Sequence, residues 1–265
     1  MLRLAANLTM LFTEVPFLDR FASAAAVGFK GVEYLFPYDF DKYVIKQRLD
    51  QHGLTQVLHN LPAGDWAAGE RGIGCHPGRH DEFEEGVATA LSYTATLGCT
   101  MLNCLAGVVP AGVDARTAHD AFIRNLRYAA PRLSAAGVRL LIEPINTRDI
   151  PGFFLTTTRQ AIDIIDEVGS DNLYLQYDIY HMQIMEGDLA KTIERNLPRI
   201  AHMQLADPPG RHQPGTGEVG FPFLLDFIDR LGYTGWIGCE YKPLGRTEDS
   251  LVWTRRFLEP VSTEH

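Results

Sequence analysis

The sequence predicts an α/β fold, a single closed (β/α)8 barrel of the TIM-barrel type that occupies residues 1–265 as one domain. Short apolar runs alternate with longer segments of helical periodicity along the whole chain, which is the pattern of a parallel sheet. Eight such pairs occur, the number that closes a barrel, and 265 residues is the usual size of one barrel. A doubly wound sheet would have fewer strands and an edge strand outside the pattern.

The eight expected strands are mainly apolar runs of five or six residues each, at 2–7, 31–35, 55–59, 101–105, 139–143, 173–178, 200–205 and 236–240. Helices are expected between and after them, at 16–27, 40–52, 81–97, 114–136, 158–168, 188–197, 221–231 and 248–259. Thr158 and Asp188 are expected to cap their helices. Several expected helices end at a glycine, such as Gly98, which is a typical stop signal.

One connection breaks this pattern. Residues 60–80 form a long glycine-rich stretch that contains Trp66 and Arg71. Connections longer than about 12–15 residues in compact domains are usually functional or disordered. Because this stretch follows the third expected strand, it should lie on the face of the barrel that carries active sites. We expect a lid over a substrate, and a long surface excursion is the alternative.

Composition limits the class of protein. The net charge is −9 at pH 7, so general binding to nucleic acid is not expected, and an anionic ligand needs locally placed cations. The four cysteines lack CxxC spacing, no N-terminal stretch resembles a signal peptide, and no apolar run is long enough to span a membrane. These features predict a cytoplasmic protein without membrane association. Whether it forms a homo-oligomer is left open.

Oxygen-bearing side chains stand at or near the ends of four consecutive expected strands: Glu143, Asp178, Gln204 and Glu240. The C-terminal ends of barrel strands converge on one opening, so these groups should share a cavity. Three carboxylates there repel one another unless a cation lies among them, and oxygen ligands suit Mg²⁺ or Mn²⁺ better than Zn²⁺. A single acid after a strand is more often a helix cap, and Gln204 alone could equally satisfy backbone groups. Four in succession favour a divalent metal site.

Two of these acids also suggest a reaction. Glu143 and Glu240 come from different strands and are expected to move a proton between neighbouring carbons of a small α-hydroxycarbonyl acid. One glutamate removes the proton and the other returns it, while the metal stabilises the enediolate between the two steps. Such an isomerisation needs no further cofactor.

A small anionic 2-oxo acid requires a cation in the cavity. Arg211, in the Gly/Pro-rich loop after the seventh expected strand, is the first candidate, and Lys242 and Arg71 are alternatives. His181 follows the sixth strand and is expected either to bind a substrate oxygen or orient a ligand, or to pack at the opening. His59 and Asn60, at the end of the third strand, are further pocket candidates, and for His59 a buried structural histidine is the simpler interpretation.

Two polar residues inside expected strands receive no functional role from the sequence. Glu33 lies in the second expected strand, but no partner for it can be identified. His202 shares a face with Gln204 two residues later, and its position further down the barrel predicts a core residue.

Six blocks of the sequence carry a family resemblance: AANLTMLFTEVPF, HNLPAGDWAAGERG, LLIEPINTRDIPGF, QYDIYHMQIMEGD, PGTGE and GWIGCEYKP. Together they resemble the hydroxypyruvate isomerase family, within the xylose isomerase-like barrel superfamily, from about residue 4 to about 255. The resemblance implies that Glu143 and Glu240 are the acid–base pair. It also implies a metal held at Glu143, Asp178, Gln204 and Glu240. Related sugar epimerases have His where Gln204 stands, which leaves open whether the metal is strictly required.

The reaction that the resemblance implies converts hydroxypyruvate into 2-hydroxy-3-oxopropanoate (tartronate semialdehyde). Members of the same family act on four-carbon 2-oxo acids such as 2-oxo-tetronate, and others are sugar epimerases, so the chain length of the substrate is left open. Two other classes of protein fit the sequence less well. A metal-dependent endonuclease for damaged DNA would need a basic face and a His-rich zinc cluster, and the sequence shows neither. A non-catalytic sugar-acid-binding protein would be expected to lack one of the two glutamates, and both are present.

Overall fold

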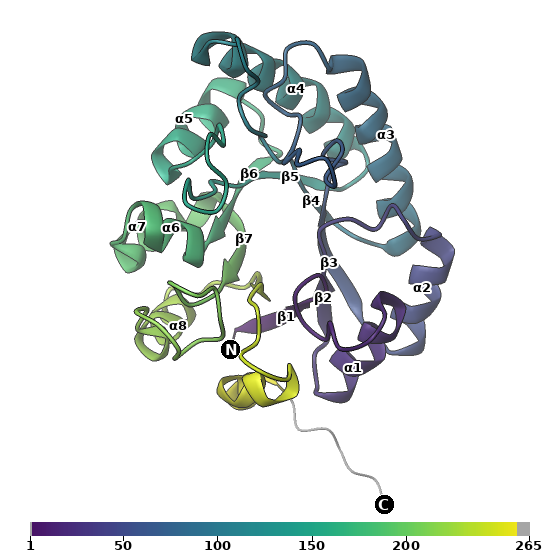
Figure 1. Ribbon diagram of the computed structural model, residues 1–265, viewed down its shortest axis with the longest axis vertical. Helices are drawn as coiled ribbons and strands as arrows, with labels where there is room; N and C mark the ends of the chain where they lie inside the picture. Colours follow the sequence, from purple (N-terminus) through teal and green to yellow (C-terminus); the bar gives the residue numbers. More distant parts are fainter. Residues whose placement is uncertain (1, 259–265) are drawn as a thin grey trace, which may run out of the picture.

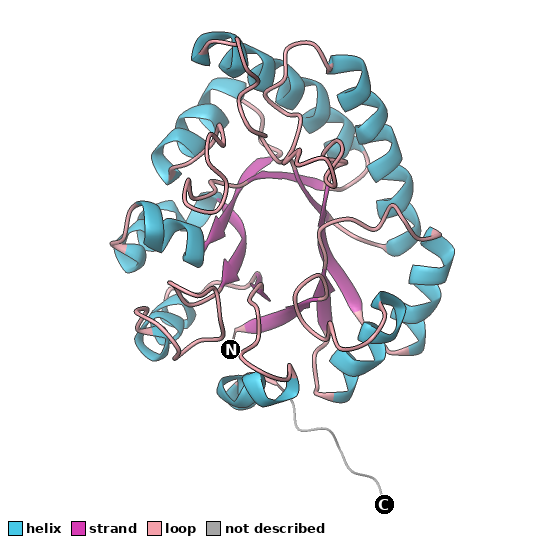
Figure 2. Ribbon diagram, viewed as in Figure 1, coloured by secondary structure: helices cyan, strands magenta, loops and turns pink. Residues whose placement is uncertain are grey.

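The computed structural model describes residues 2–258, and its eight strands form one closed barrel in sequence order. Figure 2 shows the strands as a central ring with the helices outside it. The strands are β1 Arg3–Asn7, β2 Gly31–Glu33, β3 Thr55–Asn60, β4 Met101–Asn103, β5 Arg139–Ile142, β6 Leu173–Asp178, β7 Ile200–Leu205 and β8 Trp236–Cys239. All neighbouring strands are parallel, and β1 pairs with β8 to close the ring. The predicted (β/α)8 fold is confirmed.

The helices pack around this ring (Figure 1). They are α1 Arg20–Ala26, α2 Lys42–Gln51, α3 His80–Leu97, α4 Ala115–Ala135, α5 Thr158–Val168, α6 Ile179–Met185, α7 Leu189–Asn196 and α8 Phe221–Arg230, with short 3-10 helices η1 Phe17–Asp19, η2 Leu197–Arg199 and η3 Glu248–Arg256. Two features differ from the sequence prediction. The short helix α6 was not expected, and the last segment is a 3-10 helix rather than an α-helix. Residue 259, the expected end of that segment, lies outside the described residues.

The two expected helix caps need correction. Thr157, not Thr158, caps α5, because its hydroxyl accepts the backbone N–H of Gln160. Asp188 precedes α7, but its backbone has a left-handed φ of 45° and its side chain makes no capping hydrogen bond. Gly98 ends α3 in the left-handed conformation, with φ of 70°, as predicted.

The barrel interior changes from apolar to polar along the strands. An apolar cluster inside the barrel includes Ala5 of β1, Met101 of β4 and Leu141 of β5. Side chains two residues apart on a strand share a face, so Asn7 and Asn103 follow on the same inner face, one layer closer to the C-terminal ends. The larger apolar core lies between the strands and the helices. The polar layer is therefore concentrated at one end of the barrel.

Two expectations from the sequence concern the cysteines and membrane association. All four cysteines are buried and free. Within residues 2–258, none of the helices combines the length and hydropathy that crossing a membrane requires.

Candidate active site

A cavity of about 560 Å³ opens at the C-terminal ends of the strands. Of the ten residues that the sequence predicts for the site, eight line it: Asn60, Arg71, Glu143, His181, Gln204, Arg211, Glu240 and Lys242. Glu143 and Glu240 each follow their strand by one residue, so the turn of the chain after β5 and after β8 directs them into the same opening. Asp178, the last residue of β6, is 1% exposed and lies at the floor.

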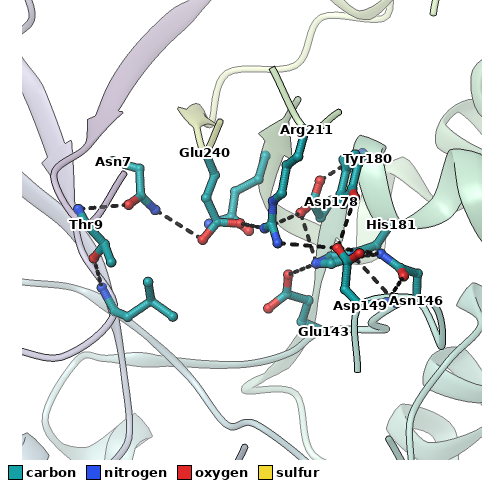
Figure 3. A network of polar contacts seen from close by, with 12 residues as sticks. Asn7, Thr9, Glu143, Asn146, Asp149, Asp178, Tyr180, His181, Arg211 and Glu240 are labelled. Carbon is teal, nitrogen blue, oxygen red and sulfur yellow. Dashed lines mark hydrogen bonds and ion pairs between the residues drawn. The ribbon is translucent and has the colours of Figure 1, made fainter. Parts of the chain in front are cut away.

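Four of these side chains form a compact buried cluster. One ligand atom each from Glu143, Asp178, His181 and Glu240 lies within 4.8 Å of all the others. His181 Nε2 is 3.4 Å from Asp178 Oδ2 and 3.9 Å from Glu143 Oε1. Figure 3 shows these groups pointing toward one another around the guanidinium of Arg211. The two glutamates, remote in sequence, therefore share one environment.

Burial makes this cluster electrostatically unfavourable. Burial, together with the charges of Glu240 and Asp178, raises the pKa of Glu143 well above its usual value. Burial raises the pKa of Asp178 to about 6, although Arg211 opposes the change. Burial also raises the pKa of Glu240 to about 8, against the lowering effect of Arg211. Without added positive charge, Glu143 and Glu240 are the carboxyl groups that retain protons near neutral pH, whereas Asp178 loses its proton above about pH 6.

Arg211 supplies part of that charge. Its Nη2 is 2.6 Å from Glu240 Oε2 and 3.7 Å from Asp178 Oδ2, and its Nη1 is 3.8 Å from Asp149 Oδ2. The guanidinium also lies 4.9 Å from the centre of the Tyr180 ring. Three carboxylates therefore surround this single cation.

The hydrogen bonds of His181 fix its tautomer. Its Nδ1 accepts the backbone N–H of Asn146 at 3.3 Å and lies 2.7 Å from the Asn146 side-chain nitrogen. A ring nitrogen that accepts a backbone N–H carries no proton, so the proton of the neutral ring is on Nε2. Burial, with the charge of Arg211, lowers the pKa of His181 well below its usual value, which keeps the ring neutral. His181 therefore presents an N–H donor toward Asp178 and Glu143.

The residues of the cluster fit a divalent cation. Asp178 Oδ2 is buried without a hydrogen-bond partner, although buried carboxylate oxygens normally have one. Glu143, Asp178 and Glu240 offer the carboxylate oxygens that Mg²⁺ and Mn²⁺ prefer. The Gln204 oxygen already accepts a hydrogen bond from Gln176 Nε2 at 2.7 Å, and its second lone pair is the one available to a cation.

The cationic side chains that line the cavity differ in their hydrogen-bond and ion-pair partners. Arg71 donates from Nη1 to the backbone oxygens of Trp66 and Glu70 at 3.1 and 2.7 Å, and its guanidinium lies 4.3 Å from the Trp66 ring centre. Trp66 in turn packs against Phe36, so the long loop after β3 forms one wall. In the part of the chain that the structure describes, no hydrogen bond or ion pair holds the ammonium group of Lys242. Lys242 is also exposed to solvent, so its ammonium group is free to meet an anionic ligand.

His59 is the predicted residue that lies neither at the cavity wall nor in the buried cluster. Its side chain is fully buried, and it does not line the cavity. Its Nδ1 is 2.9 Å from Gln56 Nε2, and its ring packs edge-on against Tyr38. The strand continues one residue further than expected, and Asn60 takes the place at the cavity wall. The position of His59 therefore does not support direct contact with a substrate.

Several polar residues at the site were not predicted from the sequence. Asn103 donates from Nδ2 to Glu143 Oε2 at 3.0 Å, and Asn7 donates from Nδ2 to Glu240 Oε1 at 3.2 Å. Asn7 ends its strand as expected and would have been a candidate on that ground, whereas Asn103 was hidden because the expected fourth strand ran on to residue 105. The contact of Asn146 with His181 leaves no comparable signal, because Asn146 lies in an irregular loop.

Comparison with known proteins places this geometry in a family. The model of the xylose isomerase-like TIM barrel family matches residues 21–257. The chain is 54% identical to a hydroxypyruvate isomerase of Escherichia coli K12, over 96% of this chain and 98% of the relative. It is 47% identical to a 2-oxo-tetronate isomerase of Cupriavidus necator, over 97% of this chain and 98% of the relative.

A solved structure agrees with this placement. The crystal structure described as AP endonuclease, family 2, from Brucella melitensis superimposes with a TM-score of 0.96 at 47% identity, over 98% of this chain and 100% of that one. The chain belongs to the xylose isomerase-like TIM barrel family. Within it, the hydroxypyruvate and 2-oxo-tetronate isomerases are relatives that match it over nearly its full length, in agreement with the resemblance seen in the sequence.

Proposed function

We propose that the protein is an isomerase that interconverts hydroxypyruvate and 2-hydroxy-3-oxopropanoate, with Glu143 and Glu240 as its acid–base pair. The observation that carries this proposal is the shared buried cluster, in which the two carboxyl groups lie beside Asp178 and His181. Their raised pKa values suit groups that exchange protons near neutral pH. Relatives named as isomerases of this chemistry cover nearly the whole chain.

The protein's own residues account for each proton. One glutamate removes a proton from C3 of hydroxypyruvate, and the other delivers a proton to C2, while the hydroxyl proton passes from the oxygen on C3 to the oxygen on C2. The N–H of His181 is placed to donate to a substrate oxygen in this cluster. A divalent cation held by Glu143, Asp178 and Glu240, with Gln204 beside them, would supply positive charge for the two substrate oxygens.

The substrate carboxylate needs a cation that is not already neutralised. Arg211 faces three carboxylates within 3.8 Å, whereas the ammonium of Lys242 has no such partner among the described residues. Both line the cavity. The contacts therefore favour Lys242 as the group that binds the substrate carboxylate, with Arg211 balancing the cluster. Arg71 and Trp66 complete the wall on the side of the long loop, which we assign as the lid.

The chain length of the substrate is the open part of the proposal. A cavity of about 560 Å³ holds a three-carbon or a four-carbon 2-oxo acid, and relatives are named for each. The 2-oxo-tetronate isomerisation is therefore the second candidate. It uses the same two glutamates, and only the contacts to the distal carbon differ.

Incubation in D₂O with three-carbon and four-carbon 2-oxo acids tests the reaction directly. We expect deuterium at the exchanging carbon together with the aldehyde product, detected by NMR, and the faster substrate identifies the chain length. Glu143→Gln and Glu240→Gln are each expected to abolish exchange while the circular dichroism spectrum stays unchanged. Retained turnover in either folded variant would contradict the assignment.

The description of the Brucella structure as an AP endonuclease suggests a different class, an endonuclease. The net charge of −9 opposes binding to a polyanion, and the cluster within residues 2–258 contains three carboxylates and one histidine rather than a His-rich zinc set. No specific observation favours it. The absence of nucleic-acid binding, a cytoplasmic location and the oligomeric state stay predictions from the sequence.

A further inference from the structure

The lining of the cavity includes a buried carboxylate that the proposed reaction does not use. Glu33, the last residue of β2, is fully buried. Its Oε1 accepts hydrogen bonds from Asn7 Nδ2 at 3.0 Å and from Gln204 Nε2 at 2.7 Å, and its Oε2 lies 2.7 Å from His202 Nε2. The glycine at 238 makes room for it, because a Cβ there would overlap the Glu33 carboxylate.

A carboxylate only accepts hydrogen bonds, so it dictates how its amide neighbours are oriented. Gln204 must turn its NH₂ toward Glu33, which directs its oxygen toward Gln176 Nε2. Asn7 must do the same, and its oxygen then accepts the backbone N–H of Thr9 at 3.1 Å. The Asn7 nitrogen also reaches Glu240 Oε1 at 3.2 Å, a contact visible in Figure 3.

We propose that Glu33 is a positioning residue for the isomerisation: through Asn7 it sets the place of the Glu240 carboxylate, and through its hydrogen bond to Gln204 it keeps that amide oxygen on Gln176 at the cavity wall. This inference rests on the proposed function. Both carboxylate oxygens of Glu33 are already engaged by side chains of the protein, so we assign it an indirect role. The positioning depends on how far the Glu33 side chain extends (its reach) and on the hydrogen bonds that its oxygens accept. It does not depend on the negative charge of Glu33.

Two conservative variants separate reach from charge. Glu33→Asp keeps the charge but withdraws the carboxylate by about 1.5 Å, the length of one carbon–carbon bond. Glu33→Gln keeps the reach but removes the charge. Its oxygen still accepts from Asn7 and Gln204, and its NH₂ donates to His202 Nε2 once the imidazole proton moves to Nδ1.

A displaced catalytic group lowers kcat more than it raises KM. We expect Glu33→Asp to lower kcat by about a hundredfold and Glu33→Gln to lower it by less than about fivefold, with KM nearly unchanged in both. Glu14→Asp is the matched control, because Glu14 accepts hydrogen bonds from Thr247 outside the cavity. It should leave kcat unchanged. A larger loss in Glu33→Gln than in Glu33→Asp, or unchanged kcat in folded Glu33→Asp, would overturn the inference.

If Glu33→Asp fails to fold, Gly238→Ala tests the same inference. Its methyl group pushes the Glu33 carboxylate away without removing any polar group. The expected result is again a loss in kcat, and an unchanged kcat would overturn the inference.

A second readout needs no turnover. The side-chain NH₂ protons of Asn7 and Gln204, followed by ¹⁵N–¹H NMR, should exchange slowly with solvent in the wild type and in Glu33→Gln and faster in Glu33→Asp. Equal exchange in all three proteins would overturn the inference. A wild type that brings no deuterium into any 2-oxo acid would count against the proposed function alone, because the amide protons still report on Glu33.

Discussion

The buried glutamate at 240 should make the metal-free protein less stable as the pH rises. Burial raises the pKa of Glu240 from 4.5 to about 8. The folded protein therefore keeps a proton that the unfolded chain releases above about pH 4.5. Its contribution to stability is fully present below pH 4.5 and is lost as the pH rises through about 8. Glu240→Gln imitates the protonated side chain at every pH, so the variant escapes this loss.

The size of the effect follows from the pKa difference. At about 1.4 kcal/mol for each pKa unit, the rise from 4.5 to about 8 corresponds to about 5 kcal/mol in the free energy of unfolding. This is an upper bound for the variant, because Glu143 and Asp178 share the same cluster and take up part of the proton. We expect Glu240→Gln to gain several kcal/mol relative to the wild type between pH 5 and pH 9.

Urea unfolding in the presence of a chelator, at pH 5 and pH 9, measures this difference. Glu14→Gln is a control that should be flat over this range: burial raises the pKa of Glu14, but hydrogen bonds from Thr247 outweigh it and lower the pKa overall. The stability that Glu14 contributes is already complete above about pH 4.5, so the difference between this variant and the wild type should be the same at pH 5 and at pH 9. If the wild type instead gains stability over Glu240→Gln toward pH 9, the ion pair with Arg211 outweighs burial, and our account of the cluster is wrong.

Three further predictions concern the cavity and the core. Lys242→Met should raise KM for a 2-oxo acid by at least about tenfold and leave a neutral analogue unaffected, and equal effects on both would remove the role of Lys242. Chelation should abolish deuterium exchange and added Mg²⁺ or Mn²⁺ should restore it, whereas full activity after verified metal removal would mean that the glutamates work alone. Burial lowers the pKa of His59 to about 3. The unfolded chain binds a proton at His59 below about pH 6.5 and the folded protein does not, so the free energy of unfolding falls on acidification. Between pH 8 and pH 5, this free energy should fall by about 2 kcal/mol less in His59→Gln than in the wild type.

The sequence could predict the barrel and its main acids for a simple physical reason. Parallel strands bury their apolar side chains and end at one face, so the residue at each strand end is informative before any contact is known. Glu143, Asp178 and Glu240 were found in this way, and the structure places them together. The reasoning required only the order of the strands, which the alternation of the chain supplies.

The contacts inside the barrel could not be found in the same way. His202 and Glu33 come from β7 and β2, which are not neighbours in the sheet, and their contact depends on the registers of the strands between them. The register of β2 against β3 also shifts between Val32 and Glu33. Because a slip of one residue reverses the faces of a strand, such a shift decides whether His59 or Asn60 reaches the cavity. The pattern of apolar residues in the sequence does not reveal this register shift.

The sequence also could not rank the cations, because it shows which charges are near the site but not which are already paired. Arg211 has a left-handed backbone, with φ of 58°, and its guanidinium lies where Glu240 and Asp178 converge. A divalent cation at the cluster would share both carboxylates with it. Two cations that share the same ligands repel each other, so removing the guanidinium charge should strengthen metal binding. The charge of Arg211 therefore stabilises the carboxylates and would limit their affinity for a divalent cation, which is why we propose Lys242 rather than Arg211 for the substrate carboxylate.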